Sequence, residues 1–392
     1  MFKAARGFAF PIHVRREAIT LTLLTGMAIG LFLVVTVLSG MYHVQQQALA
    51  ERWASRGTED LQARQYRSAA DEFRTALRYS HDDFAQQLGL AEALIGMKRI
   101  PEAEVYLVNL WEQEPENGIV NRELARIAAG RNNTRQALRY YHNAIYATWP
   151  GNAENERRET RWELIKYLLN LDAREQAQSE LISLAAEVGD DPGQQLVLGQ
   201  YFLKVQDDQH ALACFRIAMA ADPHNESAMA GAGEAAFDMA DYPQAERYLR
   251  KALAEKSGDR DSAVRLETTE QVLRLDPFRG DLSDAQRDQA AIAAFGVAGD
   301  RLKACTAAGG SAEPVTTAMP QTATPQPQQT LADTWNHMKP HMTERRLQEN
   351  SDLVNQAMDL VFAIERQANA KCGAGTPSDV ALLLISKLHE GS

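Results

Sequence analysis

Two stretches of this 392-residue sequence, 34 residues apart, decide the fold: GQYFLKVQDDQHALACFRIAMAADP (residues 199–223) and GEAAFDMADYPQAERYLRKALAEKS (residues 233–257). Each begins with a glycine, has an alanine twelve residues later, a bulky apolar residue four after that alanine, and a small residue three further on. Equivalent alanines recur at intervals of 34, 34, 40, 34 and 34 residues: Ala69, Ala103, Ala137, Ala177, Ala211 and Ala245. A fixed period of this size indicates a repeat architecture.

The repeating unit has the pattern of two helices joined as a hairpin. A small residue on the first helix and the alanine on the second would let the two backbones approach, and the apolar residues four and seven positions later would fill the seam with the neighbouring hairpin. Twelve residues before each alanine stand Gly57, Ala91, Ala125, Ile165, Gly199 and Gly233. One such hairpin cannot bury its own apolar face, so we expect the hairpins to stack.

This spacing resembles the tetratricopeptide repeat family. Pro115 and Pro223 stand where the second helix would end, and Pro101 and Pro243 stand near its first turn, where a missing N–H costs nothing. The resemblance covers about half the chain. It implies an all-α fold, a right-handed α-solenoid with six hairpins over residues 50–259, and a surface that binds protein partners.

The single break in the period lies between the third and fourth hairpins. Six residues, Asn152 to Arg157, follow Pro150 and Gly151 there. Insertions in repeat proteins map to surface loops. We therefore expect a charged loop, with the fourth hairpin restarting near Arg158.

The N-terminal region carries a candidate membrane anchor. An uncharged run from Ala18 to Met41 has 24 residues, which at 1.5 Å per residue exceeds the roughly 30 Å hydrocarbon thickness of a bilayer. We predict one transmembrane helix over residues 18–43. A cleaved signal peptide is the alternative, although the run is longer than a typical h-region and no clear cleavage site follows it.

The charges that flank this run predict its orientation. Residues 1–17 hold four basic side chains and one acid, whereas the two arginines that soon follow the run are offset by acids. This asymmetry favours a cytoplasmic N-terminus and a periplasmic repeat domain at a bacterial inner membrane. Gly26 and Gly30 form a Gly-x-x-x-Gly pair, so a homodimer through this helix is one interpretation; glycines that merely occur in a membrane helix are the other.

The chain after the repeats divides into three parts. Residues 260–305 have the pattern of two helices, either a degenerate hairpin or capping helices over the last repeat. Residues 306–330 are rich in Ala, Thr, Pro and Gln and predict a flexible linker. Residues 331–392 form a C-terminal helical segment, with a helix start at Thr376. Because about sixty residues bury little surface alone, this tail would pack on the array, hold a partner or self-associate.

Little in the sequence predicts catalysis. We find no nucleophile elbow, phosphate loop or zinc-protease motif, so we expect neither enzymatic activity nor a cofactor or metal site. The net charge of −11 disfavours binding to nucleic acid. Cys305 and Cys372 flank the linker and would form a disulfide in an oxidising compartment, with two free thiols as the alternative. Cys214 has the setting of a buried apolar residue.

The family resemblance also implies which residues face a partner. In that family, the first helix of each hairpin lines a concave groove. Matched by phase, this groove would contain Glu92, Arg122, Arg126, Lys166, Gln200, Lys204, Glu234 and Phe237. Arg122 and Arg126 lie one turn apart and would jointly hold a carboxylate, although the asparagines of the full carboxylate clamp are missing. Charged groups that are simply solvated remain the alternative.

These observations predict a membrane-anchored scaffold or adaptor. It would bind protein partners, such as membrane-complex subunits or translocated proteins, in envelope assembly or translocation, or as an accessory subunit. Two alternatives remain: a structural subunit of a large complex held by its C-terminal segment, and a carrier of a cofactor or metal with its site in the tail.

Overall fold

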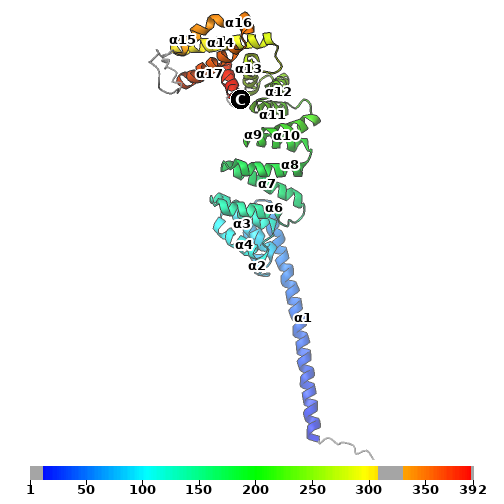
Figure 1. Ribbon diagram of the computed structural model, residues 1–392. Coiled ribbons are helices and arrows are strands. Elements are labelled where there is room, and N and C mark those ends of the chain that lie inside the picture. Colours follow the sequence, from blue (N-terminus) through cyan, green and yellow to red (C-terminus); the bar gives the residue numbers. More distant parts are fainter. Residues whose placement is uncertain (1–11, 308–329, 390–392) are drawn as a thin grey trace, which may run out of the picture. The chain divides into compact units, whose positions relative to one another are not determined.

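In a computed structural model of the chain, residues 12–307 and 330–389 are described, with side chains from residue 20 onward. The regular elements among them are helices (Figure 1). The N-terminal residues 1–11 and most of the predicted linker, residues 308–329, lie outside the described part. The chain forms two compact units, residues 1–167 and residues 168–392, which are described separately below.

Twelve helices follow one another over the repeat region, and the all-α, hairpin-type fold predicted from the period is confirmed. In chain order they are α1 (Ile12–Gln62), α2 (Tyr66–Leu77), α3 (Phe84–Gly96), α4 (Ile100–Gln113), α5 (Gly118–Gly130), α6 (Thr134–Tyr146), α7 (Ala153–Asn170), α8 (Arg174–Val188), α9 (Pro192–Lys204), α10 (Asp208–Ala221), α11 (Glu226–Asp238) and α12 (Tyr242–Glu255). Pro115 and Pro223 each follow the end of a helix by two residues, and Pro101 and Pro243 lie in first turns, as expected.

The repeated positions form the core. All six marker alanines have no exposed surface, and the bulky residues four positions later are at most 4% exposed. The small residue of the first helix is required by close contact: a Cβ built on Gly57 would lie 3.1 Å from the Phe73 ring, and one built on Gly199 would lie 2.6 Å from the Phe215 ring. The period of the sequence therefore reflects the close helix packing that each hairpin repeats.

The turns inside the hairpins repeat as well. Six residues adopt the left-handed conformation, with φ between 56° and 62°, each five positions before a marker alanine: Arg64, Lys98, Asn132, Asp172, Gln206 and Ala240. None is a glycine, although glycine adopts this conformation at the lowest cost. Because the residue types at these turns vary, no single residue type marks them in the sequence.

The structure of the insertion between the third and fourth hairpins differs from the predicted loop. The expected surface loop from Asn152 to Arg157 with a restart near Arg158 is wrong, because α7 begins at Ala153 and includes most of the inserted residues. The side chain of Asn152 accepts a hydrogen bond from the backbone N–H of Asn155 at 3.3 Å, and two glutamates in the first turn interact favourably with the helix N-terminus. The insertion thus lengthens a helix.

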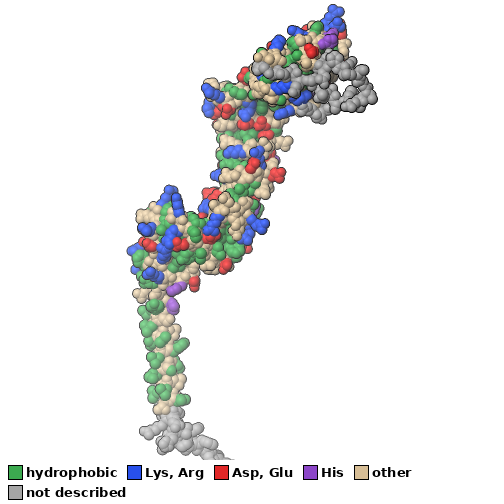
Figure 2. All heavy atoms as spheres, turned by 90° about the vertical axis from the view of Figure 1, so that its left-hand side faces the viewer, with side chains coloured by type: hydrophobic (Ala, Val, Ile, Leu, Met, Phe, Trp, Pro, Cys, Tyr) green, Lys and Arg blue, Asp and Glu red, His purple; other side chains and the backbone are tan. Residues whose placement is uncertain are grey.

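Helix α1 runs without interruption from Ile12 into the first hairpin, where it packs against α2 (Figure 1). From Thr20 onward it is one helix whose length and composition would allow it to cross a membrane, and no residue of its apolar stretch is buried inside the structure. The side chains along this part are mainly hydrophobic in Figure 2. An N-terminal signal sequence has the same properties, so the anchor remains a proposal.

The C-terminal part of the second unit forms one shared core. It contains α13 (Arg260–Leu275), α14 (Asp284–Ala307), α15 (Leu331–Met338), the short 3-10 helix η1 (Lys339–His341), α16 (Glu344–Glu349), α17 (Asp352–Cys372) and α18 (Pro377–His389). We call these elements the cap. Helix α14 packs against α17, and α18 packs against α13. Of the three alternatives for the tail, the structure has the one in which it packs back on the same chain.

Contacts across the cap join segments that are far apart in the sequence. The Trp335 ring stacks on Phe295 with centroids 5.3 Å apart, and its indole N–H donates to the Phe295 carbonyl at 3.2 Å. Cys305, near the end of α14, forms a disulfide with Cys372 at the end of α17. Cys214 is buried, and burial raises the pKa of its thiol to about 11. Residues 260–305 and 331–389 therefore belong to one domain rather than to two independent segments.

Candidate functional site

The residues predicted to line a concave face fall into both units. Glu92, Arg122, Arg126 and Lys166 belong to residues 1–167. The remaining four, Gln200, Lys204, Glu234 and Phe237, belong to residues 168–392. Each group is therefore considered within its own unit.

Arg122 on α5 is held by its own chain. Its Nη1 lies 2.6 Å from Oε2 of Glu156 on α7, and its guanidinium lies 4.6 Å from the centroid of the Trp149 ring. Its side chain is only 15% exposed. These contacts give Arg122 a positioning role at the junction of α5 with the segment before α7.

Arg126 is likewise occupied. It makes two parallel hydrogen bonds to the Glu163 carboxylate, one of them from Nε at 2.9 Å, and a further ion pair with Glu123. The hydrogen bonds to Glu163 raise the pKa of Arg126. Arg122 and Arg126 thus hold carboxylates of this chain, and the predicted joint grip on a partner's carboxylate would have to displace them.

Acidic groups outnumber basic ones on this face of the first unit. Glu92 and Glu123 are both largely buried near the two arginines, and burial raises the pKa of each carboxyl; in Glu92 the neighbouring Glu123 adds to the effect. Together with Glu156 and Glu163, four carboxyl groups surround two guanidinium groups. This environment disfavours an anionic ligand.

The other predicted residues differ in accessibility. Lys166, Gln200 and Lys204 are exposed, and the Lys204 ammonium lies 4.3 Å from the centroid of the Tyr201 ring. Glu234 pairs with Arg265 of α13 at 2.9 Å. Phe237 is half-buried against Tyr242, with ring centroids 5.5 Å apart. The guanidinium of Arg265 also lies 5.9 Å from the centroid of the Phe237 ring. Helix α13 therefore contacts both Glu234 and Phe237, whereas Lys166, Gln200 and Lys204 are open to solvent.

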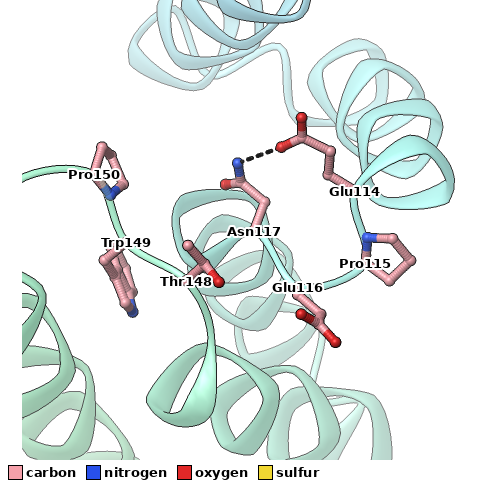
Figure 3. Close-up of a pocket in the computed structure, with 7 residues that line it drawn as sticks. All are labelled: Glu114, Pro115, Glu116, Asn117, Thr148, Trp149 and Pro150. Atoms are coloured by element: carbon pink, nitrogen blue, oxygen red, sulfur yellow. Dashed lines mark hydrogen bonds between the residues drawn. The ribbon is translucent and has the colours of Figure 1, made fainter.

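A groove that the sequence reasoning missed lies in the first unit. It occupies about 630 Å³ between the α4–α5 connection and the α6–α7 connection (Figure 3). We call it the junction groove; its lining residues are Glu114, Pro115, Glu116, Asn117, Thr148, Trp149 and Pro150.

Backbone pairing fixes the two sides of the junction groove. The N–H of Gly118 donates to the Thr148 carbonyl at 3.0 Å, and the N–H of Thr148 donates to the Glu116 carbonyl at 2.9 Å. The Trp149 indole donates to the Ala144 carbonyl at 2.8 Å and is 6% exposed. These bonds hold two connections together that would otherwise be independent loops.

One signal in the sequence marked this location. The interval between Ala137 and Ala177 is 40 residues instead of 34, and the junction groove lies next to that break. The change of period indicated an altered connection, but it did not show that the residues before the insertion would pair with the preceding connection.

A second groove of about 570 Å³ lies in the same unit. Its lining combines apolar with charged residues: Ile95, Ile100, Pro101, Glu123, Arg126, Ile127, Gly130 and Arg131. Among the described residues, no group of three or more His, Cys, Asp or Glu side chains is placed to hold a metal ion.

Comparison with known families addresses the repeats directly. A family model described as tetratricopeptide repeat matches residues 60–127. Over residues 60–127, therefore, the sequence is similar to tetratricopeptide repeats. The matched residues extend from the end of α1 into α5 and include Ala69, Phe73 and Ala103, three of the buried repeat positions.

Solved structures with similar helices share little sequence with this chain. YrrB, described as a TPR protein with an unusual peptide-binding site, is 15% identical with a TM-score of 0.39, covering 50% of this chain and 97% of YrrB. Pseudomonas aeruginosa pilF is 14% identical with a TM-score of 0.38, covering 58% of this chain and 98% of its own. PilW, described as a type IV pilus biogenesis factor, is 14% identical with a TM-score of 0.36, covering 56% and 98%. No curated protein sequence matches this chain significantly.

Proposed function

We propose that this chain is a membrane-anchored tetratricopeptide repeat protein that binds protein partners at the periplasmic face of a bacterial inner membrane. It acts as a scaffold or adaptor and not as an enzyme. The observation that carries this proposal is the continuity of α1, in which one helix contains both the apolar stretch and the first helix of the repeats.

The continuity of α1 supports a specific mechanism. A flexible linker would let the repeats move away from the bilayer, whereas a continuous helix keeps them close. Residues 44–57, between the apolar stretch and the first buried repeat glycine, would rise about 20 Å as a helix. Partners at the membrane surface would therefore meet the repeats at a high effective concentration.

Two further features support the compartment. The basic residues of the N-terminal segment, Lys3, Arg6, Arg15 and Arg16, favour a cytoplasmic N-terminus. The Cys305–Cys372 disulfide is the kind of bond that persists in an oxidising compartment such as the periplasm.

The cap makes the repeats, rather than the tail, the better candidate for partner binding. Most apolar side chains of α15, α17 and α18 are buried in the core they share with α13 and α14: Leu331, Trp335, Val354, Met358, Val361, Ile364, Leu382 and Ile385 are at most 6% exposed. A tail that uses these residues internally has few left for gripping a neighbouring subunit. The exposed residues Lys166, Gln200 and Lys204 are available on the repeats.

Anchoring and orientation are tested on the full chain in its native membrane. Alkaline carbonate extraction should leave the protein in the pellet, and the N-terminal sequence of the purified protein should precede Ala18. Protease added to spheroplasts should digest residues beyond His43, whereas protease should reach residues 1–17 only after lysis. A soluble chain that begins near residue 43 would show a cleaved signal peptide and refute the anchor.

Partner binding is tested by site-specific photo-crosslinking in native membranes. A photoreactive residue placed at Gln200, Lys204 or Lys166 should give discrete crosslinked products with defined proteins. A photoreactive residue at Leu31, within the apolar stretch, is the control for contacts made by the anchor alone. If positions on the repeats never give a discrete product, the scaffold proposal is wrong.

A further inference from the structure

The junction groove combines an apolar floor with acidic edges. Its apolar part consists of Pro115, Trp149 and Pro150, and its charged part consists of Glu114 and Glu116. No Lys or Arg is among its lining residues. Both glutamates are exposed, and neither forms an ion pair with a described residue; Glu114 accepts one hydrogen bond, from the Asn117 side-chain amide at 3.0 Å.

The floor of the groove is fixed before any ligand arrives. A Cβ built on Gly118 would lie 2.3 Å from the Trp149 ring, so the ring rests directly on the backbone of α5. Arg122 covers the ring and is itself held by Glu156, a residue of the insertion. A rigid apolar surface loses little conformational entropy when it binds.

The side chains of Glu114 and Glu116 point in different directions. In Figure 3 the side chains of Glu114 and Glu116 extend to opposite sides of Pro115. Both glutamates belong to the α4–α5 connection, whereas Trp149 and Pro150 belong to the α6–α7 connection (Figure 3). A ligand in the groove would therefore meet two carboxylates on one side and apolar side chains on the other. Lysine and arginine match this pattern, because their apolar stems cover hydrophobic surface while their charged ends reach a carboxylate.

We propose that the junction groove binds a short basic segment of a protein partner through Lys or Arg side chains that lie on the exposed Pro115 and Pro150 and pair with Glu114 and Glu116. This inference rests on the proposed partner-binding function and identifies the chemistry of one partner. The site lies on the connections between hairpins, so it is separate from the surface formed by the first helix of each hairpin.

The first experiment measures binding of a defined probe to the full chain in nanodiscs. The probe is the capped peptide Arg-Pro-Arg-Pro-Arg, and the comparison peptide has Glu in place of Arg. We expect binding of the Arg peptide only, weakening as salt rises because the contacts are exposed ion pairs. Absence of binding by the Arg peptide, or equal binding by both peptides, would refute the proposal.

Matched variants separate a site from general attraction to an acidic protein. The double variant Glu114→Gln with Glu116→Gln should weaken binding of the Arg peptide about tenfold, as expected for two charge-assisted contacts. The control double variant, Glu112→Gln with Glu154→Gln, removes the same charge from exposed positions outside the groove. Equal weakening by both pairs would mean that net charge alone attracts the peptide.

A second experiment identifies the natural segment. A photoreactive residue at Thr148, which is exposed in the groove, should crosslink in native membranes to a peptide containing Lys or Arg, and this product should be lost in the Glu114→Gln, Glu116→Gln variant. A crosslinked peptide that is acidic or apolar, or that comes from a second copy of this chain, contradicts the proposal.

The two proposals fail in different ways. If Thr148 gives no product while Gln200 or Lys204 still captures partners, the junction groove is not a binding site but the scaffold function stands. If no position on the repeats captures a partner, the scaffold function itself is wrong.

Discussion

The ring of Phe215 on α10 lies against the backbone of Gly231 on α11, the first helix of the following hairpin: a Cβ built on Gly231 would be 2.4 Å from the ring. The same ring also lies against Gly199 of its own hairpin, with the corresponding distance 2.6 Å. Phe215 has no exposed surface. In the first unit Phe73 has the same arrangement between Gly57 and Gly89. One aromatic ring thus joins two consecutive hairpins.

Replacement of Gly231 by alanine should therefore destabilise the second unit. The new methyl group would push a fully buried aromatic ring, and overpacking of this kind costs about 1–3 kcal/mol. Urea unfolding of the full chain, followed by circular dichroism, would measure the change. Gly296→Ala is the matched control, because this exposed glycine of α14 has nothing within 4 Å of a built Cβ and alanine favours a helix by about 1 kcal/mol. Equal stability of the two variants would contradict this packing.

The sequence predicted the parts of this fold that depend on local spacing. The period located the buried alanines, and Pro115 and Thr376 marked a helix end and a helix start close to where the structure has them. The core of the cap was not predictable, because the stacking of Trp335 on Phe295 joins residues 40 apart across a segment without pattern. The insertion is helical although insertions in repeat proteins usually form surface loops, because its residues favour the start of α7.

The candidate site was only partly predictable for a similar reason. Phase within the repeat selects the helix on which Arg122 and Arg126 lie, but it does not show which carboxylates they contact. Glu156 and Glu163 lie 34 and 37 residues further along the chain, and their pairing depends on the insertion. The junction groove depends on backbone pairing between two connections, for which the sequence has no motif.

The left-handed turn at Ala240 should be improved by glycine. Its φ of 60° costs an L-residue about 1–2 kcal/mol. Glycine avoids this cost, but its greater conformational freedom in the unfolded chain offsets part of the gain in stability. We expect Ala240→Gly to stabilise the second unit by about 0.5–1 kcal/mol, measured by thermal unfolding. Asn132→Gly is the comparison at the same repeat position, and it should gain less because asparagine tolerates this conformation. A destabilised Ala240→Gly protein would refute the argument.

Loss of the Cys305–Cys372 disulfide should loosen the cap. The bond closes a loop of 67 residues, for which the chain-entropy model gives a stabilisation of about 4 kcal/mol. In the variant with both cysteines replaced by serine, limited proteolysis should cut the cap faster than in the unchanged protein. Cys214→Ala is the control, because this thiol is buried elsewhere. An unchanged cleavage rate would show that packing of α14 against α17 is sufficient alone.

The same cysteines report the compartment. If the cap is periplasmic, trapping of thiols in intact cells followed by denaturation should label Cys214 alone. Labelling of all three cysteines in cells, with oxidation only after lysis, would place the cap in a reducing compartment and contradict the proposed orientation. Reduction before labelling is the control, because it should make all three reactive.

Glu365 should make the stability of the cap depend on pH. This residue is 1% exposed, and its burial raises the pKa of the carboxyl to about 8. The nearby Asp379 raises the pKa further, whereas Arg301 lowers it. In the unfolded chain the group titrates near its ordinary value of 4.5, so between about pH 4.5 and 8 the folded state holds a proton that the unfolded state has lost. Stability therefore falls as pH rises through this window, by about 1.4 kcal/mol for each pKa unit of the shift.

The variant Glu365→Gln tests this dependence, because it keeps the shape of the side chain and removes the titratable carboxyl. It should match the unchanged protein near pH 4.5 and exceed it increasingly up to pH 8 in denaturant unfolding monitored through the cap. Parallel stability curves for the two proteins across this range would show that Glu365 is ionised in the folded cap.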